Sequence, residues 1–259
     1  MRALLIGDIM GKPGRRALEA TLPRLREEES LDLVIANGEN AAGGYGLTAE
    51  TADAILAAGA DVITSGNHIW DQREVLSLME AELPILRPAN YPEGAPGRGM
   101  LRVGDAVVIN LQGRVFMPEG TDSPWTVVDD LLAQLEDDTP KYVFVDFHTE
   151  ATSEQNAMGW YLDGRVSTVV GTHTHVPTAD ARVLPKGTAY VTDLGMTGAV
   201  HSIIGSNPDD VLARFLTAMP RRLNVAGGSG PVQFNAVLVE LDGLSGLAKQ
   251  IRRVDRVTP

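Results

Sequence analysis

Residues 1–14 read MRALLIGDIMGKPG, and this stretch introduces the pattern that much of the chain repeats. The apolar run Arg2–Gly7 predicts a strand, and Asp8 follows directly at its end. Pro13 is typical of a first helical turn, so we expect a helix over Pro13–Glu29, kinked or broken at Pro23. A strand, a polar residue at its end and a helix together predict an α/β unit.

Short apolar runs alternate with helical stretches along the rest of the chain, which favours α/β architecture. The expected strands are Asp32–Ala36, Asp61–Thr64, Met100–Val103, Ala106–Leu111, Tyr142–Phe147, Val166–Val170, Ala189–Thr192, and a hairpin of Val232–Leu241 with Leu247–Val254. The expected helices are Thr48–Ala58 with Thr48 as N-cap, Gln72–Ala81, one from Ser123-Pro124 to about Leu135, one capped by Ser153, and one opened by Asn207-Pro208. We expect a single domain over residues 1–259, built on a mixed sheet or two packed sheets flanked by helices.

The composition narrows the class of protein. The chain has 259 residues, 44% of them hydrophobic, with a net charge of −12 and no cysteine. Its charge argues against a long nucleic-acid partner, because such partners are bound by basic surfaces. No run of 18 apolar residues predicts a membrane span, and no disulfide can form. We expect a cytoplasmic protein without a membrane partner, and a homo-oligomer is compatible with the sequence.

Residue types that bind metals gather at the ends of five predicted strands, where α/β folds place their sites. They are Asp8, Glu39 with Asn40, Asn67 with His68, His148, and His173 with His175. Each has a simpler explanation alone, such as a helix cap for Asp8 or a turn for Glu39 and Asn40. On one extended strand, His173 and His175 would share a face. Together these residues favour a metal site.

The ligand types restrict the metal. Carboxylates, asparagine oxygens and imidazoles form a mixed oxygen and nitrogen set that suits Mn, Fe, Zn, Co or Ni. The set is larger than one open catalytic metal needs, so it favours two metals sharing a bridging carboxylate. Two such ions can activate a water and neutralise a phosphate, which predicts a hydrolase of phosphate esters.

The five segments, in this order, resemble the signature of the calcineurin-like metallophosphoesterases. They are most similar to the YmdB-like family of 2′,3′-cyclic-nucleotide phosphodiesterases. The shared motifs are GDIMGKPGR (7–15), ANGENAAGGYGLT (36–48), DVITSGNHIWD (61–71), DFHTEATSE (146–154), GTHTHVPTAD (171–180) and YVTDLGMTG (190–198). The chain departs from the wider superfamily at Met10, where a histidine is usual, and at Glu39, where an aspartate is usual.

The resemblance implies a sandwich of two mixed β-sheets flanked by α-helices. It implies that Asp8, Asn40 and His175 bind a first metal, that Asn67, His148 and His173 bind a second, and that Glu39 bridges them. Iron or manganese, divalent or of mixed valence, is implied most directly. His68 beside the metals is implied to be the acid or charge stabiliser, while a metal-bridging hydroxide attacks the phosphorus.

We therefore predict a phosphodiesterase for small phosphodiesters, with 2′,3′-cyclic nucleotides leading. Two alternatives stay open, a phosphomonoesterase and a regulatory nucleotide-binding protein that turns over slowly. Lys12 is the only basic residue within the cores of the metal-binding motifs. A doubly charged monoester would ordinarily recruit more arginine or lysine, so this favours singly charged diesters. Tyr45 beside Glu39 is a candidate for stacking on a base, although a mobile turn explains it as well. Asp71 is expected to cap a helix, Trp70 to pack, and His201 to lie outside the site.

Overall fold

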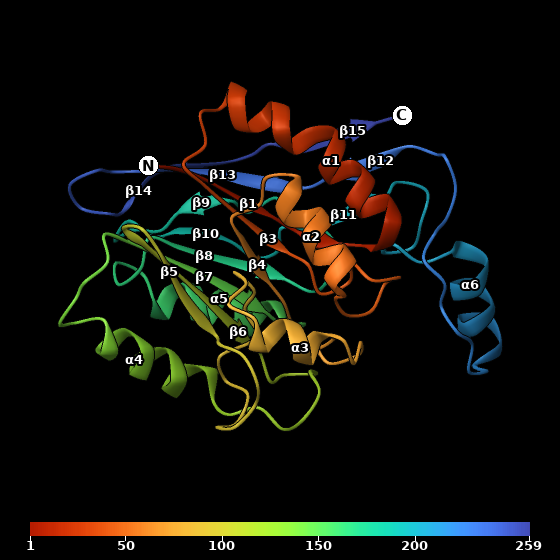
Figure 1. Ribbon diagram of the computed structural model, residues 1–259, viewed down its shortest axis with the longest axis horizontal. Helices are drawn as coiled ribbons and strands as arrows, with labels where there is room; N and C mark the ends of the chain where they lie inside the picture. The colour runs from red at the N-terminus through yellow and green to blue at the C-terminus, as the bar shows by residue number, and fades with distance from the viewer.

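The computed structural model describes residues 1–259 and contains two large mixed β-sheets with helices on their outer sides (Figure 1). The first sheet has the strand order β14 (Ala248–Arg253), β13 (Ala236–Leu241), β1 (Arg2–Ile6), β3 (Leu33–Asn37), β4 (Val62–Thr64). The second has the order β5 (Met100–Val103), β6 (Ala106–Gln112), β7 (Tyr142–His148), β8 (Thr168–Thr172), β10 (Ala189–Val191), β9 (Arg182–Val183). Each combines parallel and antiparallel pairs, which confirms the predicted class of fold.

The side chains of β1 show how the two sheets pack. Ala3 and Leu5 point into the core between the sheets, where they meet residues such as Phe144 of β7. Leu4 and Ile6 point to the opposite face and join the core beneath the helices. This alternation follows from the two-residue period of a strand, and it requires apolar residues at every position of a strand covered on both faces.

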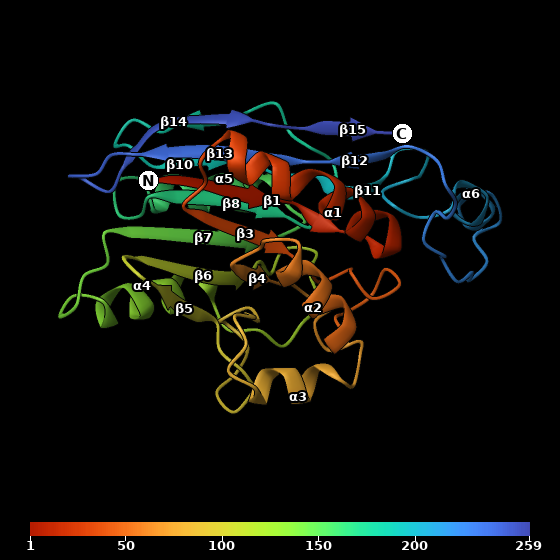
Figure 2. The same ribbon diagram turned by 45° about the horizontal axis from the view of Figure 1, so that its top comes forward.

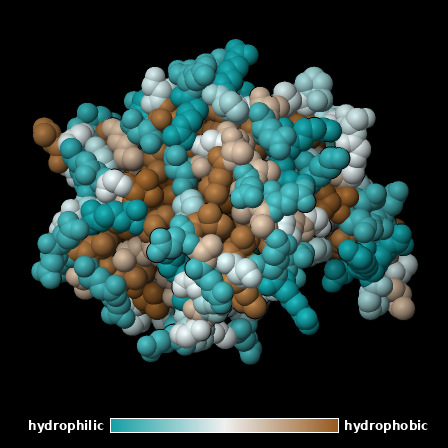
Figure 3. Space-filling view, in the orientation of Figure 1, coloured by the Kyte–Doolittle hydropathy of each residue, from teal (hydrophilic) through white to brown (hydrophobic).

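The helices cover the two outer faces (Figure 2). On the first sheet these are α1 (Gly11–Glu28), α2 (Ala49–Ala57) and α3 (Val75–Glu80). On the second they are α4 (Pro124–Gln134) and α5 (Thr152–Tyr161). The remaining helix, α6 (Pro208–Thr217), projects from the body on the right of both views. None of these helices combines the length and apolar character needed to cross a bilayer, and hydrophobic residues on the face in Figure 3 lie in patches among hydrophilic ones.

The expected strand Val232–Leu241 was wrong as a single element. The structure divides it into β12 (Val232–Phe234) and β13, which belong to different sheets. The division falls at Asn235, whose carbonyl accepts a hydrogen bond from the Gly7 N–H at 3.0 Å. β12 joins a third sheet that we did not predict, of order β15 (Arg256–Thr258), β12, β11 (Met196–Ala199), β2 (Asp8–Ile9). β13 pairs with β1, whereas β12 pairs with β11 and β15, so the chain changes partners at Asn235.

Two expectations about helices were also wrong in whole or in part. Of the kink or break expected at Pro23, the break is not found, because α1 runs through this residue as one helix, and a kink there stays a prediction. Pro23 lies on the exposed side between the buried Leu22 and Leu25, whose packing offsets the lost backbone hydrogen bond. Ser153 does not cap the following helix, which begins at Thr152 with no side-chain cap. The cap predicted at Thr48 is confirmed, and helices begin as predicted at Ser123-Pro124 and Asn207-Pro208, where the structure shows Ser123 and Asn207 as N-caps.

Candidate metal centre and active site

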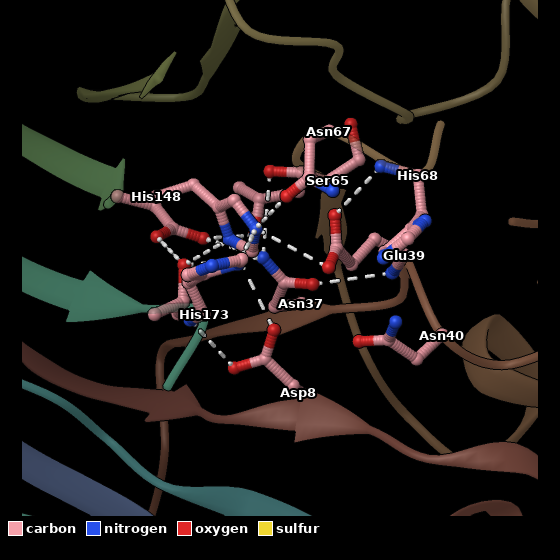
Figure 4. A network of polar contacts seen from close by, with 12 residues as sticks. Asp8, Asn37, Glu39, Asn40, Ser65, Asn67, His68, His148 and His173 are labelled. Carbon is pink, nitrogen blue, oxygen red and sulfur yellow. Dashed lines mark hydrogen bonds and ion pairs between the residues drawn. The ribbon is translucent and has the colours of Figure 1, made fainter. Parts of the chain in front are cut away.

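All eight residues predicted for the site come together at one edge of the sandwich. Three groups follow strands of the first sheet: Asp8 after β1, Glu39 and Asn40 after β3, and Asn67 and His68 after β4. Two groups come from the second sheet: His148 ends β7, and His173 and His175 follow β8. Figure 4 shows Asp8, Glu39, Asn67, His148 and His173 facing one another. The carboxyl ends of the parallel strands of both sheets lie at this edge, so the fold brings the residues from the two sheets together.

His148 is the centre of one group of ligand atoms. Its Nε2 lies 3.1 Å from Asn67 Oδ1, 3.1 Å from His173 Nδ1 and 3.2 Å from Glu39 Oε1. Ligand atoms bound about 2.0–2.2 Å from one metal ion are separated by roughly 3.0–3.5 Å. These four residues therefore have the spacing of a coordination shell, and Glu39, His148 and His173 form a cluster able to hold an ion.

A second group surrounds Asp8. His175 Nε2 lies 3.2 Å from Asn40 Oδ1 and 3.9 Å from Asp8 Oδ1. Asp8 is fully buried, and its Oδ1 has no hydrogen-bond partner in the protein. A buried carboxylate oxygen without a partner is costly, and a bound cation would remove this cost. The residues present therefore fit a metal here too.

Burial and mutual charge set the ionisation of the site. Burial raises the pKa of Asp8 well above its usual range. Burial acts in the same direction on Glu39, but the charge and hydrogen bond of His148 outweigh it and lower the pKa of Glu39 to about 2. Burial opposes protonation of His148, yet Glu39 and then Asp8 outweigh it and raise the pKa of His148 to about 9. A proton on His148 balances these carboxylates without an ion, and metal binding to His148 requires that proton to leave.

The outward nitrogen of each candidate histidine ligand has its own partner. His148 Nδ1 lies 2.9 Å from Thr172 Oγ1, which donates in turn to Asp146. Because the Thr172 hydroxyl proton goes to Asp146, Nδ1 of His148 is the donor and Nε2 is left free to bind a metal. Asp146 was not singled out from the sequence, although a carboxylate inside the apolar strand YVFVDFH was a usable signal.

The other two rings are oriented by groups that we also did not predict. His175 Nδ1 donates to the backbone carbonyl of Ile204 at 2.8 Å. His173 Nε2 lies 3.1 Å from Glu150 Oε2, so its Nδ1 faces His148. Partners of this kind fix ring orientation and tautomer in metal sites. A backbone carbonyl leaves no signal in the sequence, whereas Glu150 lies only two residues after His148.

His173 and His175 do not lie on an extended strand, so the expectation of a shared face was wrong. β8 ends at Thr172, and the two histidines have φ angles of 111° and 65°. These left-handed conformations are uncommon for residues other than glycine and cluster at functional sites. The backbone N–H of His173 also donates to Asp8 Oδ2 at 3.2 Å. The turn sends His173 to one ligand group and His175 to the other.

His68 lies beside the ligands with a partner of its own. Its Nδ1 is 2.8 Å from Asp71 Oδ2, and its backbone N–H donates to Glu39 Oε2 at 3.2 Å. Asp71 was expected only as a cap, so this pairing corrects that interpretation. Tyr45 approaches the His68 ring edge-on with 5.1 Å between ring centroids, and Trp70 packs on Tyr91 as expected. A side chain at Gly66 would overlap His148 and Glu39, so glycine is required before Asn67.

The site opens into a pocket of about 280 Å³. Its lining includes members of both ligand groups together with His68, Tyr45 and Glu150, but no lysine or arginine; the members are Glu39, Asn40, His173 and His175. Lys12 lines a different hollow together with Arg16, and the exposed His201 also lies outside this pocket. The only cationic groups of the chain beside a substrate here would be protonated histidines, so bound metals would supply most of the positive charge.

The chain is similar to known proteins over nearly its whole length. The sequence profile of the family described as "YmdB-like protein" matches residues 4–254. A protein of Bacillus subtilis (strain 168) named "2′,3′-cyclic-nucleotide 2′-phosphodiesterase" is 46% identical over 258 residues, covering 98% of this chain and 96% of that protein. A hypothetical protein from Thermus thermophilus is 46% identical with a TM-score of 0.92 and full coverage of both chains. A structure described as a novel phosphatase from Mycoplasma pneumoniae is 33% identical, with a TM-score of 0.92, 99% coverage of this chain and 93% of that one.

Proposed function

The chain belongs to the YmdB-like protein family, and from this we propose that it is a metal-dependent phosphodiesterase that opens 2′,3′-cyclic nucleotides. The observation that carries the proposal is the joining of two ligand groups and His68 in one pocket without lysine or arginine. The name of the Bacillus subtilis relative supports the substrate, and the ligand geometry supports the chemistry.

We propose two transition-metal ions, with iron or manganese favoured and zinc, cobalt or nickel compatible with the same ligands. Asp8, Asn40 and His175 would hold the first, and Asn67, His148 and His173 the second. The buried Glu39 would reach both, because its Oε1 lies by His148 of the second set and it directly precedes Asn40 of the first. When bound, the ions supply a water of lowered pKa and neutralise the phosphate oxygens.

We propose that His68 is the group that donates a proton to the leaving oxygen of the substrate. Asp71 occupies Nδ1, which leaves Nε2 without a hydrogen-bond partner in the chain and available to a substrate. A histidine oriented by a carboxylate can hold a proton at Nε2 and donate it as the ester bond breaks. Tyr45, edge-on to this ring, stays a candidate for contact with the base.

The charge of the pocket favours a diester over the alternative phosphomonoester. A diester carries one negative charge, whereas a monoester carries nearly two at neutral pH. Enzymes that bind doubly charged phosphates commonly add arginine or lysine, and this pocket contains neither. The net charge of −12 further disfavours long polyanions.

The test is a comparison of 2′,3′-cyclic AMP, 3′,5′-cyclic AMP, AMP and a short RNA under one metal condition. We expect ring opening of 2′,3′-cyclic AMP to be the fastest reaction, because its strained ring carries a single charge and a tethered leaving oxygen. Phosphate release from AMP faster than this ring opening would replace the diesterase by a phosphatase. Tight binding of the cyclic nucleotide without appreciable turnover would favour the regulatory alternative.

His68→Ala is expected to slow hydrolysis by about 10²–10⁴-fold while metal content stays near normal. The loss should be smaller for bis(p-nitrophenyl) phosphate, because nitrophenolate needs little protonation to depart. Rates for both substrates and the metal content of the protein are the measurements. An equal loss for good and poor leaving groups would make His68 an electrostatic or positioning residue instead.

Three further expectations stay proposals. We propose a single domain over residues 1–259, since strands of both large sheets share one core. A cytoplasmic location and assembly into a homo-oligomer stay predictions, to be measured by cell fractionation and by light scattering.

A further inference from the structure

Glu150 places a carboxylate in the pocket in addition to those of the metal ligands. It lies in the turn between β7 and α5 and lines the same pocket as His68 and Tyr45. Its side chain is 50% exposed, and its one ion-pair contact is with His173 Nε2 at 3.1 Å. No lysine or arginine lines the pocket to neutralise it. A negative charge therefore faces the space where the phosphate of a substrate would lie.

This charge changes the balance of the loaded site. On the proposed function, two divalent ions bring four positive charges, and Asp8 and Glu39 cancel two of them. Glu150 cancels one more, so the site offers the ligand one positive charge fewer than it would without this residue. The loss of that charge weakens binding of a doubly charged monoester more than binding of a singly charged diester. Like charges a few ångströms apart in a partly buried pocket repel appreciably.

The reaction converts the first kind of ligand into the second. The oxygen of water bonds to phosphorus, the bond from phosphorus to the 2′ oxygen breaks, and that oxygen takes a proton. The other proton of the water stays on the new phosphate monoester, whose second pKa is about 6, so it is largely lost at neutral pH. The product therefore carries nearly one more negative charge than the substrate while still beside Glu150.

We propose that the charge of Glu150 makes the site select singly charged diesters and release the doubly charged monoester product. This inference rests on the proposed function and deepens it. Glu150 also contacts His173, so a purely positioning role must be separated from a charge effect. Glu150→Gln separates them, because the amide oxygen can still accept from His173 Nε2 while the charge is lost.

The experiment compares the wild type, Glu150→Gln and a matched control, Glu136→Gln, each loaded with Mn²⁺ and assayed for metal content. Glu136 is an exposed glutamate that lines a separate hollow near α4. The dissociation constants of 3′-AMP and of adenosine are measured by calorimetry, and kcat/KM is measured for 2′,3′-cyclic AMP and p-nitrophenyl phosphate. In Glu150→Gln we expect 3′-AMP to bind on the order of tenfold tighter, with adenosine unchanged. The ratio of monoester to diester kcat/KM should rise by a similar factor, and Glu136→Gln should match the wild type.

Unchanged affinity for 3′-AMP together with equal losses for both esters would overturn the proposal and leave Glu150 a positioning residue. Loss of metal from Glu150→Gln would have the same meaning, since the charge would then serve His173. If the wild type opened no cyclic diester, the proposed function would fail instead. The dissociation constants of 3′-AMP and of adenosine, compared between the wild type and Glu150→Gln, would still decide whether the charge of Glu150 excludes monoesters.

Discussion

Glu39→Gln is expected to lower hydrolysis of 2′,3′-cyclic AMP by at least ~10³-fold and to remove bound metal. Glu39 is 1% exposed, and its two oxygens have different neighbours, His148 Nε2 at 3.2 Å and the His68 N–H at 3.2 Å. Glutamine has nearly the same shape, but it is neutral and replaces one acceptor oxygen by a donor NH₂. The change therefore removes charge and one oxygen ligand together. Turnover and metal per protein, measured on the same sample, test this.

His201→Ala is the control for Glu39→Gln. His201 is exposed and lies in a separate hollow with Arg16 and Gly230, so its loss should leave rate and metal content unchanged. Circular dichroism of both variants checks that each is folded. Equal losses of rate in the two variants would show that the site has been misplaced.

Removal of the metal ions by a chelator is expected to reduce hydrolysis to the background rate, and Mn²⁺ or Fe²⁺ should restore it. The pocket has no lysine or arginine to replace the charge of the ions, so no partial activity should survive. Thermal stability should fall together with the rate, because a ligand that binds only the folded state stabilises it. Asp8 Oδ1, buried without a partner, then loses its cation.

Calcium is the control ion in this experiment. Ca²⁺ prefers six to eight oxygen ligands, whereas the group around His148 contains two histidine nitrogens and the group around Asp8 contains one. Ca²⁺ should therefore restore neither the rate nor the melting temperature at concentrations where Mn²⁺ does. Full activity of protein shown to be free of metal would refute the assignment of both groups.

The positions of the ligands could be predicted from the sequence because the fold places strand ends together. Each predicted ligand follows a short apolar run, and the run marks a strand whose carboxyl end lies at the site edge. The resemblance to a known family then implied which of the candidate ligands bind each of two metals. The structure brings the members of each set close together, with His148 central to one and Asp8 buried in the other.

The groups that orient the ligands could not be predicted in the same way. Asp71 lies three residues after His68, a spacing that also suits a cap, and only the structure shows the 2.8 Å contact. Ile204 acts through its backbone carbonyl, which any residue could provide. The turn at His173 was missed because left-handed backbone in a non-glycine residue is fixed by tertiary contacts, here the bond to Asp8.

The division at Asn235 was missed for a related reason. Residues 232–241 are mostly apolar, as the residues of one long strand would be, and nothing local reveals that the two halves belong to different sheets. The two halves differ in their partners, because residues 236–241 pair with β1 whereas residues 232–234 pair with β11 and β15. Local pattern identifies the strands, whereas their pairing depends on parts of the chain far apart in sequence.

The pairing of β1 with β13 has a consequence for how the protein is made. β1 is flanked by β3 and β13, and Leu4 lies opposite Leu238. While the chain is being synthesised, residues 2–6 leave the ribosome long before residues 236–241, so one edge of this strand stays open in between. Asp8 comes directly after that strand, so it reaches its final place only after residues 236–241 have been made. Such distant pairing is slow and leaves unpaired edges exposed, so the new strand can pair wrongly until residues 236–241 are available.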